Sequence, residues 1–218
     1  MCGIAGFVGP GSEQHLQAMS DAMIHRGPDG SGTLIDRPNG VFLAHRRLAI
    51  LDLAGGEQPM WNEDQQVCVV FNGEIYNHLD LRNALLAKGH VFRSDHSDTE
   101  VLVHGYEEWG EDLPQRLNGM FAFAVYDRPR KRLFIGRDRF GKKPLYYSAR
   151  KGFFGFASEL SALHKHPQVA RDIDEKSLQK YFAYGFIPAP NSLYRGVAKL
   201  PGGHWISYDI ANGAMVQR

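Results

Sequence analysis

Cysteine is scarce in this sequence, and long apolar runs are absent from it. The chain of 218 residues contains two cysteines, Cys2 and Cys68, which are too few for a disulfide framework and match no metal-binding spacing. The longest apolar run, residues 120–126, is far too short to span a bilayer. The first residues lack the basic and apolar regions of a secretory signal. We therefore expect a cytoplasmic protein without a membrane partner.

An excess of charge of one sign is also missing. Lys and Arg number 25 and Asp and Glu number 24, which gives a formal net charge of +1. This balance argues against binding to nucleic acid or to an anionic membrane. The hydrophobic content of 43% is ordinary for a globular protein. A chain of this length can form one core, so we expect a single domain over residues 1–218.

Apolar patterns predict an α+β fold, in which helices accompany antiparallel strands and no βαβ repeat occurs. We expect strands over 4–8, 41–51, 67–71, 120–127, 132–136, 144–149, 152–157 and 204–208, and helices over 12–24, 79–86, 97–109 and 175–184. The helix at 97 should begin with a capping box formed by Ser97 and Glu100. Residues 25–32 form a turn-rich loop, and the pair Asn72-Gly73 favours a turn.

Cys2 directly follows the initiator methionine. A small residue at this position allows Met1 to be removed, so the mature chain would begin with Cys2. The thiol of such a residue is a nucleophile. A free α-amine has a reference pKa of about 7.7–8.0 and can serve as the general base. Position alone also fits a small buried side chain. Cys68, within an apolar strand, is predicted to pack in the core.

The stretch FNGEIYN at 71–77 carries a second candidate function. Attack on an amide builds negative charge on its carbonyl oxygen, and two hydrogen-bond donors aimed at that oxygen form an oxyanion hole. The side-chain nitrogen of Asn72 and the backbone N–H of Gly73 are candidates for this pair, because glycine allows a close approach. The other interpretation is a plain Asn-Gly hairpin turn.

Charged residues elsewhere suit the remaining groups of an amino acid. Arg47 could bind a carboxylate through two hydrogen bonds, and Glu74 and Asp98 could pair with an ammonium group. Each has a structural alternative: a salt bridge on a strand for Arg47, and a favourable place at a helix N-terminus for Asp98. Together they match a free amino acid that carries a side-chain amide.

Seven motifs occur in a fixed order along the chain. They are MCGIAGF at 1–7, HRGPDGSG at 25–32, AHRRLAILD at 44–52, FNGEIYN at 71–77, SDTEVL at 97–102, GMFAFAVYD at 119–127 and RDRFGKKPLYY at 137–147. This combination resembles the glutaminase domain of class II glutamine amidotransferases, and it is most similar to the glutamine-hydrolysing asparagine synthetases. The resemblance extends from Met1 at least to LPGGH at 200–204.

The resemblance implies an N-terminal nucleophile hydrolase fold, which is a four-layer α-β-β-α sandwich. It implies that Cys2 is the nucleophile and that Asn72 and Gly73 form the oxyanion hole. The RDRFGKKPLYY motif would hold strands behind the site. The family's glutamine-binding positions fall on Arg47, Leu48, Ala49, Ile50, Leu51, Asn72, Gly73, Glu74 and Asp98.

The family's synthetase domain carries a Ser-Gly-Gly-x-Asp-Ser loop that grips ATP phosphates, and this sequence has no such stretch. We therefore expect either a fragment of a longer chain or a stand-alone glutaminase subunit. It would hydrolyse glutamine to glutamate and ammonia through a Cys2 thioester, with no metal or cofactor of its own. ATP, Mg²⁺ and aspartate would belong to a C-terminal synthetase domain or subunit, which uses the ammonia to make asparagine.

Two other functions remain open at this point. The glutaminase could serve an amidotransferase with a different acceptor, or the chain could be a non-catalytic domain with the same fold. The sequence does not fix the oligomeric state, and a homodimer is compatible with it.

Overall fold

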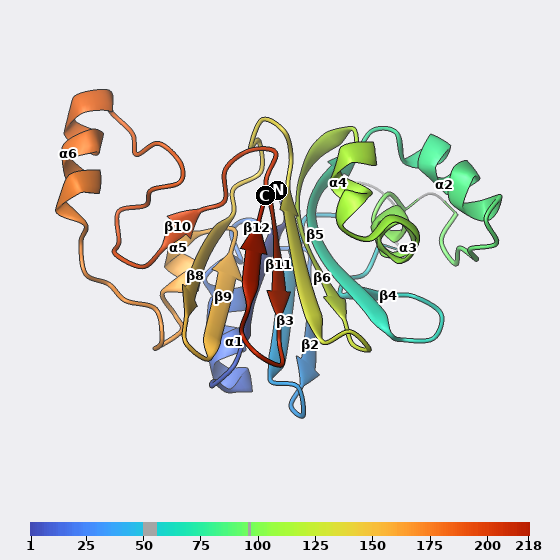
Figure 1. Ribbon diagram of the computed structural model, residues 1–218, viewed down its shortest axis with the longest axis horizontal. Coiled ribbons are helices and arrows are strands. Elements are labelled where there is room, and N and C mark those ends of the chain that lie inside the picture. The colour runs from blue at the N-terminus through green and yellow to red at the C-terminus, as the bar shows by residue number, and fades with distance from the viewer. Residues whose placement is uncertain (50–55, 96) are drawn as a thin grey trace.

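Two six-stranded antiparallel sheets stack face to face in the computed structural model, which describes residues 1–49, 56–95 and 97–218 (Figure 1). The strand order of the first sheet is β10 (Ala198–Lys199), β8 (Tyr146–Arg150), β9 (Phe153–Ala157), β1 (Gly3–Val8), β3 (Val41–Arg47) and β2 (Gly30–Asp36). The order of the second is β12 (Met215–Gln217), β11 (Trp205–Asp209), β7 (Arg132–Arg137), β6 (Gly119–Asp127), β5 (Val67–Ile75) and β4 (Met60–Trp61).

Helices cover the outer face of each sheet. The first sheet is covered by α1 (Glu13–Asp21) and α5 (Leu160–Leu163). The second is covered by α2 (His78–Leu86), α3 (Glu100–Trp109), the 3₁₀ turn η1 (Gly110–Asp112) and α4 (Leu113–Arg116). The remaining helix, α6 (Glu175–Tyr184), stands to one side of the sandwich (Figure 1). The predicted four-layer α-β-β-α arrangement is confirmed. None of the helices in the described ranges is long and apolar enough to cross a membrane.

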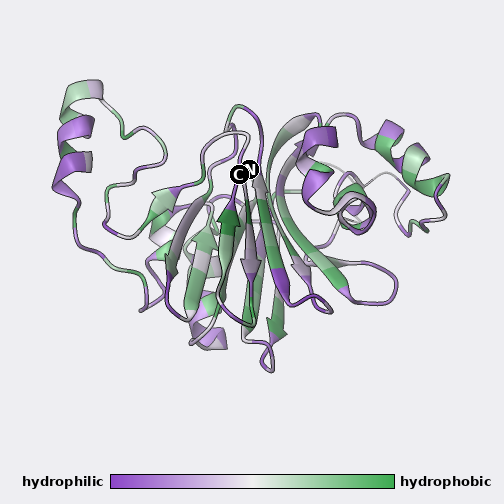
Figure 2. Ribbon diagram, in the orientation of Figure 1, coloured by the Kyte–Doolittle hydropathy of each residue, from purple (hydrophilic) through white to green (hydrophobic). Residues whose placement is uncertain are grey.

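Three apolar cores join the four layers. Successive side chains of a strand point to opposite faces, so each inner strand serves two cores. In β1, Ile4 packs between the two sheets and Phe7 packs under α1. In β5, Cys68 packs between the sheets and Val69 packs against α3. Figure 2 shows this pattern as hydrophobic strands at the centre of the molecule and hydrophilic loops around them.

Most predicted elements are confirmed to within a few residues, and the differences lie at short or half-exposed elements. The segment predicted as the loop 25–32 enters β2 at Gly30. The strand predicted over 41–51 is present as β3, which ends at Arg47. The sequence analysis missed β2, β4, β10, β12, α4 and α5. Since β4 and β10 contain two residues each, they are too short to show a periodic pattern.

The turn predicted at Asn72-Gly73 is wrong. Both residues lie within β5, where Asn72 pairs with Ala122 and Gly73 pairs with Phe121 of β6. A Cβ atom added to Gly73 would lie 2.3 Å from the carbonyl oxygen of Met120. Glycine is therefore needed here for close pairing of two strands. The long ladder between β5 and β6 outweighs the local preference of Asn-Gly for a turn.

The predicted capping box is also wrong. The N-cap of α3 is Thr99, in a helical conformation and without a side-chain cap. The Glu100 carboxylate instead accepts the backbone N–H of Arg93 at 2.7 Å. The Asp98 carboxylate accepts the backbone N–H of Ile75 at 2.9 Å. The acidic side chains before and at the start of α3 therefore hold neighbouring segments in place rather than capping their own helix.

Candidate active site

A pocket of about 220 Å³ opens where several strand ends of the two sheets meet. The start of β1 pairs with the end of β3, and the end of β5 pairs with the start of β6. This volume is below the roughly 300–1,000 Å³ typical of sites for drug-sized ligands, so it suits a smaller molecule. The predicted site residues in its wall are Cys2, Arg47, Leu48, Asn72, Gly73, Glu74 and Asp98.

The period of the strands explains why these side chains converge. Ile4 faces the core between the sheets, so Cys2, two residues earlier, lies in the same row. Asn72 likewise follows Val70, which packs in that core. Within each row an apolar residue gives way to a polar one at the end of the sheet. The space that is filled by core side chains in the middle of the sandwich therefore becomes a polar pocket at its end.

Contacts from two sides fix the position of Cys2. Its Sγ lies 3.4 Å from the backbone nitrogen of Leu48 and 3.7 Å from the carbonyl oxygen of the same residue. Its own carbonyl accepts a hydrogen bond of 2.9 Å from Nε of Arg26. Arg26 is held by an ion pair of 2.9 Å with Glu159. Met1, which precedes Cys2, is 57% exposed.

The loop 25–29 packs against the end of β3, close to Cys2. A Cβ atom at Gly27 would lie 2.5 Å from the carbonyl carbon of Arg46, so glycine allows the loop to run against the end of β3. The backbone N–H of Asp29 donates to the carbonyl of Arg47 at 3.0 Å, and its carboxylate accepts the N–H of Ala49 at 2.9 Å. This motif therefore positions the end of β3 and the residues that follow it.

The predicted glutamine-binding run 47–51 divides in the structure. Arg47 and Leu48 line the pocket. Ala49 lines an adjoining groove instead. Ile50 and Leu51 lie outside the described residues. Of this run, Arg47 and Leu48 thus lie in the pocket wall, where a glutamine-binding residue is expected.

Asn72 carries a buried donor without a protein partner. Its side chain is 1% exposed, and its Nδ2 has no hydrogen-bond partner among the described residues. A buried polar group left unpaired costs about 1–3 kcal/mol, so it calls for an explanation. Gly73, next along β5, also lines the pocket and presents backbone without a side chain. The pair can therefore serve an acceptor atom of a ligand.

Two acidic residues, Glu74 and Asp98, form an acidic part of the pocket wall. Burial raises the pKa of Asp98, and the neighbouring Glu74 carboxylate adds to this increase. The hydrogen bond from Ile75 and the proximity of His78 act in the opposite direction. Two carboxyl groups in one partly closed space favour a positively charged ligand group, because such a group would stabilise both ionised acids.

His45 is a pocket residue that the sequence analysis missed. It is 1% exposed, and its Nε2 has no partner among the described residues. Burial lowers the pKa of His45 to about 3, Arg47 acts in the same direction, and a hydrogen bond with the backbone of Phe71 opposes them. The imidazole is therefore neutral at pH 7. The signal in the sequence was a polar side chain two residues after Leu43, in an inward-facing row.

Gln58 is a second missed residue of the pocket wall. Its Oε1 accepts the backbone N–H of Phe71 at 2.6 Å, and its Nε2 lies 3.4 Å from Oγ1 of Thr99. Gln58 thereby ties β5 to the segment that leads into α3. No local pattern predicts this role, because its partners lie 13 and 41 residues away.

The RDRFGKKPLYY motif holds strands behind the site, as predicted. The Asp138 carboxylate accepts the backbone N–H of Phe121 in β6 at 3.1 Å and that of Lys143 at 3.0 Å. Lys143 also lines the pocket itself. The motif therefore contributes a wall residue in addition to its structural role.

Comparison of the sequence with known proteins identifies a matching family. Residues 1–217 match the family model described as a glutamine amidotransferase domain. Asparagine synthetase [glutamine-hydrolyzing] 3 of Bacillus subtilis is 38% identical over 216 residues, which cover 95% of this chain and 35% of that protein. Asparagine synthetase [glutamine-hydrolyzing] 2 of Arabidopsis thaliana is 44% identical over 169 residues, covering 75% and 28%. The chain thus spans about a third of the length of such relatives.

Solved structures share the fold at low sequence identity. The glutamine phosphoribosylpyrophosphate amidotransferase of B. subtilis, complexed with ADP and GMP, matches with a TM-score of 0.67 at 16% identity over 100% of this chain and 49% of that one. A glutamine aminotransferase class-II domain protein from Silicibacter pomeroyi matches with a TM-score of 0.55 at 14% identity, over 100% and 98% of the two chains. These neighbours therefore show that the chain shares their fold.

Proposed function

This chain belongs to the family of glutamine amidotransferase domains, and we propose that it hydrolyses glutamine to glutamate and ammonia with Cys2 as the nucleophile. One observation carries the proposal. The thiol of Cys2 and the unpartnered side-chain nitrogen of Asn72 belong to residues that line the same small pocket. A nucleophile and a free donor in one enclosed site are the two groups that amide cleavage requires.

Glutamine is held by its two charged ends. Arg47 binds the α-carboxylate, for which a guanidinium is suited because it donates two parallel hydrogen bonds. Asp98 and Glu74 bind the α-ammonium on the acidic wall. The side-chain amide then extends toward Cys2. Binding at both ends fixes the reacting carbon near the sulfur, which supplies part of the rate enhancement.

The reaction proceeds in two halves. The Cys2 sulfur forms a bond with the amide carbon while the thiol proton passes to the α-amine of Cys2 through a water. Asn72 and the N–H of Gly73 hold the negative oxygen of the tetrahedral intermediate. The carbon–nitrogen bond then breaks, and ammonia leaves with that proton. Water attacks the resulting γ-glutamyl thioester, the carbon–sulfur bond breaks, and glutamate and the free thiol are released.

Removal of Met1 is a condition of this mechanism. While Met1 is attached, the nitrogen of Cys2 is an amide, which cannot accept a proton at neutral pH. The mature chain therefore needs its initiator cleaved. The exposure of Met1 (57%) is compatible with such cleavage.

The acceptor of the ammonia lies outside this chain in our proposal. The relatives named glutamine-hydrolysing asparagine synthetases are about three times as long. We propose that a linked synthetase domain or subunit binds ATP, Mg²⁺ and aspartate and uses the ammonia to form asparagine. This chain with glutamine, aspartate and ATP should then form glutamate and ammonia but no asparagine.

The experiment that tests the proposal compares two forms of the same chain. One begins at Cys2, and the other retains Met1 because it is prepared without methionine aminopeptidase; intact mass verifies both. We expect the processed form to release glutamate and ammonia in equal amounts and the form with Met1 to be at least about a hundredfold slower, since it lacks the general base. Equal rates for the two forms would overturn the proposed role of the Cys2 amine.

A further inference from the structure

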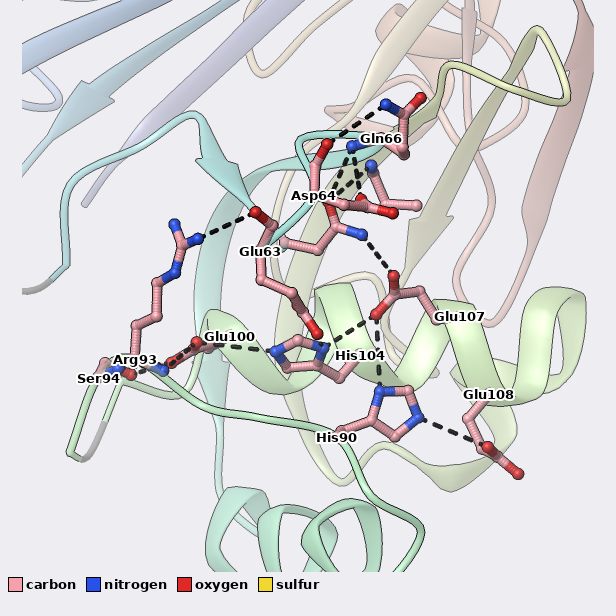
Figure 3. A network of polar contacts seen from close by, with 12 residues as sticks. Glu63, Asp64, Gln66, His90, Arg93, Ser94, Glu100, His104, Glu107 and Glu108 are labelled. Atoms are coloured by element: carbon pink, nitrogen blue, oxygen red, sulfur yellow. Dashed lines mark hydrogen bonds and ion pairs between the residues drawn. The ribbon is translucent and has the colours of Figure 1, made fainter.

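Two histidines and a glutamate form a cluster on the helix side of the second sheet. His104 and Glu107 lie on α3, and His90 lies on the segment after α2. In Figure 3 the two imidazole rings point toward the Glu107 carboxylate, which lies between them. Nδ1 of His104 is 2.9 Å from Oε2 of Glu107, and Nδ1 of His90 is 3.7 Å from the same oxygen. One ligand atom from each residue lies within 4.8 Å of the other two.

We propose that His90, His104 and Glu107 form a binding site for a divalent transition-metal ion, with Zn²⁺ as the best match. Imidazole nitrogens and carboxylate oxygens are its usual ligands. Bonds of 2.0–2.1 Å in a tetrahedron put ligand atoms about 3.3 Å apart. The separations of 2.9 and 3.7 Å lie on either side of this value. Because all three ligand atoms lie within 4.8 Å of one another, side-chain rotations would bring them to this spacing.

A carboxylate also lies near the outer nitrogen of each histidine. Nε2 of His104 lies 3.7 Å from a carboxylate oxygen of Glu100. Nε2 of His90 lies 3.5 Å from a carboxylate oxygen of Glu108. A ligating histidine usually donates its other N–H to a carboxylate, which fixes the ring and the tautomer. With each Nε2 turned to its carboxylate, both Nδ1 atoms would face the ion, and the present hydrogen bond of 2.9 Å between Nδ1 of His104 and Glu107 would be replaced by bonds from both groups to the metal.

The turn between β4 and β5 completes the surroundings. The second oxygen of Glu107 accepts a hydrogen bond of 2.5 Å from Nδ2 of Asn62, which is how ligating carboxylates are commonly oriented. A carboxylate oxygen of Glu63 lies 4.0 Å from Nδ1 of His104. Glu63 is therefore the candidate for a fourth ligand, with water as the alternative.

The charge of the cluster favours a cation. Four carboxylates surround the two imidazoles, and of these Glu108 is paired with Lys88 at 2.5 Å. A divalent ion would balance part of this negative charge, as buried charges in proteins are usually paired or coordinate a metal.

An ion here would act on the fold rather than on the substrate. It would join the turn after β4, the segment after α2 and the body of α3, which meet at this point (Figure 3). The segment that leads into α3 contains Asp98 and Thr99, which line the substrate pocket. The side chains of His90 and Glu107 are 17% and 24% exposed, so an ion can enter from solvent.

The test uses the full chain after treatment with a chelator. We expect Zn²⁺ to bind at one equivalent by calorimetry and to raise the Tm, which then levels off at one equivalent. Co²⁺ at the same site should give the visible absorption of a tetrahedral ion without a thiolate charge-transfer band, which separates it from binding at Cys2.

Matched variants assign the ligands. H90Q and E107Q should each weaken Zn²⁺ binding at least about a hundredfold, and E108Q, which removes only the outer partner of His90, should weaken it about tenfold. The control is H25Q, since His25 is an exposed histidine that pairs with a carboxylate of Glu159; its affinity should be unchanged. Absence of saturable one-equivalent binding, or unchanged binding in H90Q and E107Q, would overturn the site.

Discussion

The two cysteines of this chain lie in rows that face the same space between the sheets, yet their surroundings differ. Cys68 sits in the middle of β5, is fully buried and packs among apolar side chains. Burial raises the pKa of its thiol, so it stays protonated. Cys2 is partly exposed at the end of the space, with its sulfur beside the backbone of Leu48 and in a pocket. Position within the sandwich, not residue type, separates a packing residue from a candidate nucleophile.

Two buried asparagines repeat this contrast. Both groups of the Asn62 side chain are used, because Nδ2 donates to Glu107 and Oδ1 accepts from the backbone of Gln66 and Val67. Nδ2 of Asn72 has no partner within the described part of the chain. Asn62 therefore stabilises a turn, whereas Asn72 has a side-chain donor that the described residues leave unused. Mutations can test whether the interior residues serve stability and the pocket residues serve the reaction.

The largest effect is expected for C2A. Removing the sulfur removes the nucleophile, so glutamine hydrolysis should fall by at least about a thousandfold. The fold should remain, because the side chain is partly exposed in the pocket and lies outside the apolar core. The measurement is glutamate release at saturating glutamine, with circular dichroism as the check on folding. A C2A protein that keeps a substantial part of the activity would abolish the contrast between the two cysteines.

Next in size is N72A. Loss of one oxyanion donor typically costs about 2.7–4 kcal/mol, or roughly a hundredfold to a thousandfold in kcat. The KM should change little, because this hydrogen bond strengthens in the transition state. Steady-state kinetics separate the two constants. If only the KM rises, Asn72 is a binding residue, and its difference from Asn62 has another cause.

A smaller effect is expected for D98N. The amide keeps an acceptor for the N–H of Ile75 but loses the negative charge, so the KM should rise about tenfold, equivalent to about 1.4 kcal/mol. Because burial raises the pKa of Asp98, the native carboxyl takes up a proton at a higher pH than an exposed aspartate. The native KM should therefore increase as the pH falls through that pKa, and D98N should lack this dependence. Parallel pH profiles for the two proteins would contradict the assignment.

The smallest effect on activity is expected for C68A. Its kcat and KM should stay within about twofold of the native values, because the side chain is far inside the apolar core. Its free energy of unfolding should fall by roughly 1–2 kcal/mol, since a buried side chain is truncated. Denaturant titration measures this change. Strong loss of activity with unchanged stability would show that the interior cysteine takes part in the reaction.

The sequence predicts the strands and helices of the layers better than the turns and caps at which they begin and end. Continuous apolar runs identify β1 and the first part of β5 as buried strands, and the end of α6 at Tyr184 is also correct. The turn at Asn72-Gly73 failed because pairing with β6 is a long-range interaction that local propensity does not contain. The capping box failed because Glu100 bonds to the backbone of Arg93 instead.

The site residues show the same difference between local patterns, which the sequence reveals, and long-range contacts, which it does not. Motifs identify Cys2 and Asn72, and the structure brings both residues to one pocket, although their roles are predictions still to be tested. His45 and Gln58 were missed because their importance depends on which strands meet, and no short pattern records that. The proposed metal site was not anticipated for the same reason: His90 precedes α3 by a whole segment and joins His104 only after folding.

Covalent labelling tests the central claim most directly. A diazoketone analogue of glutamine should modify the processed chain once, and peptide mapping should place the adduct on the sulfur of Cys2 in a peptide whose α-amine is free. Excess glutamine should slow the reaction. An adduct on Cys68, or an adduct on Cys2 in a chain that still carries Met1 and turns over at the full rate, would contradict the account.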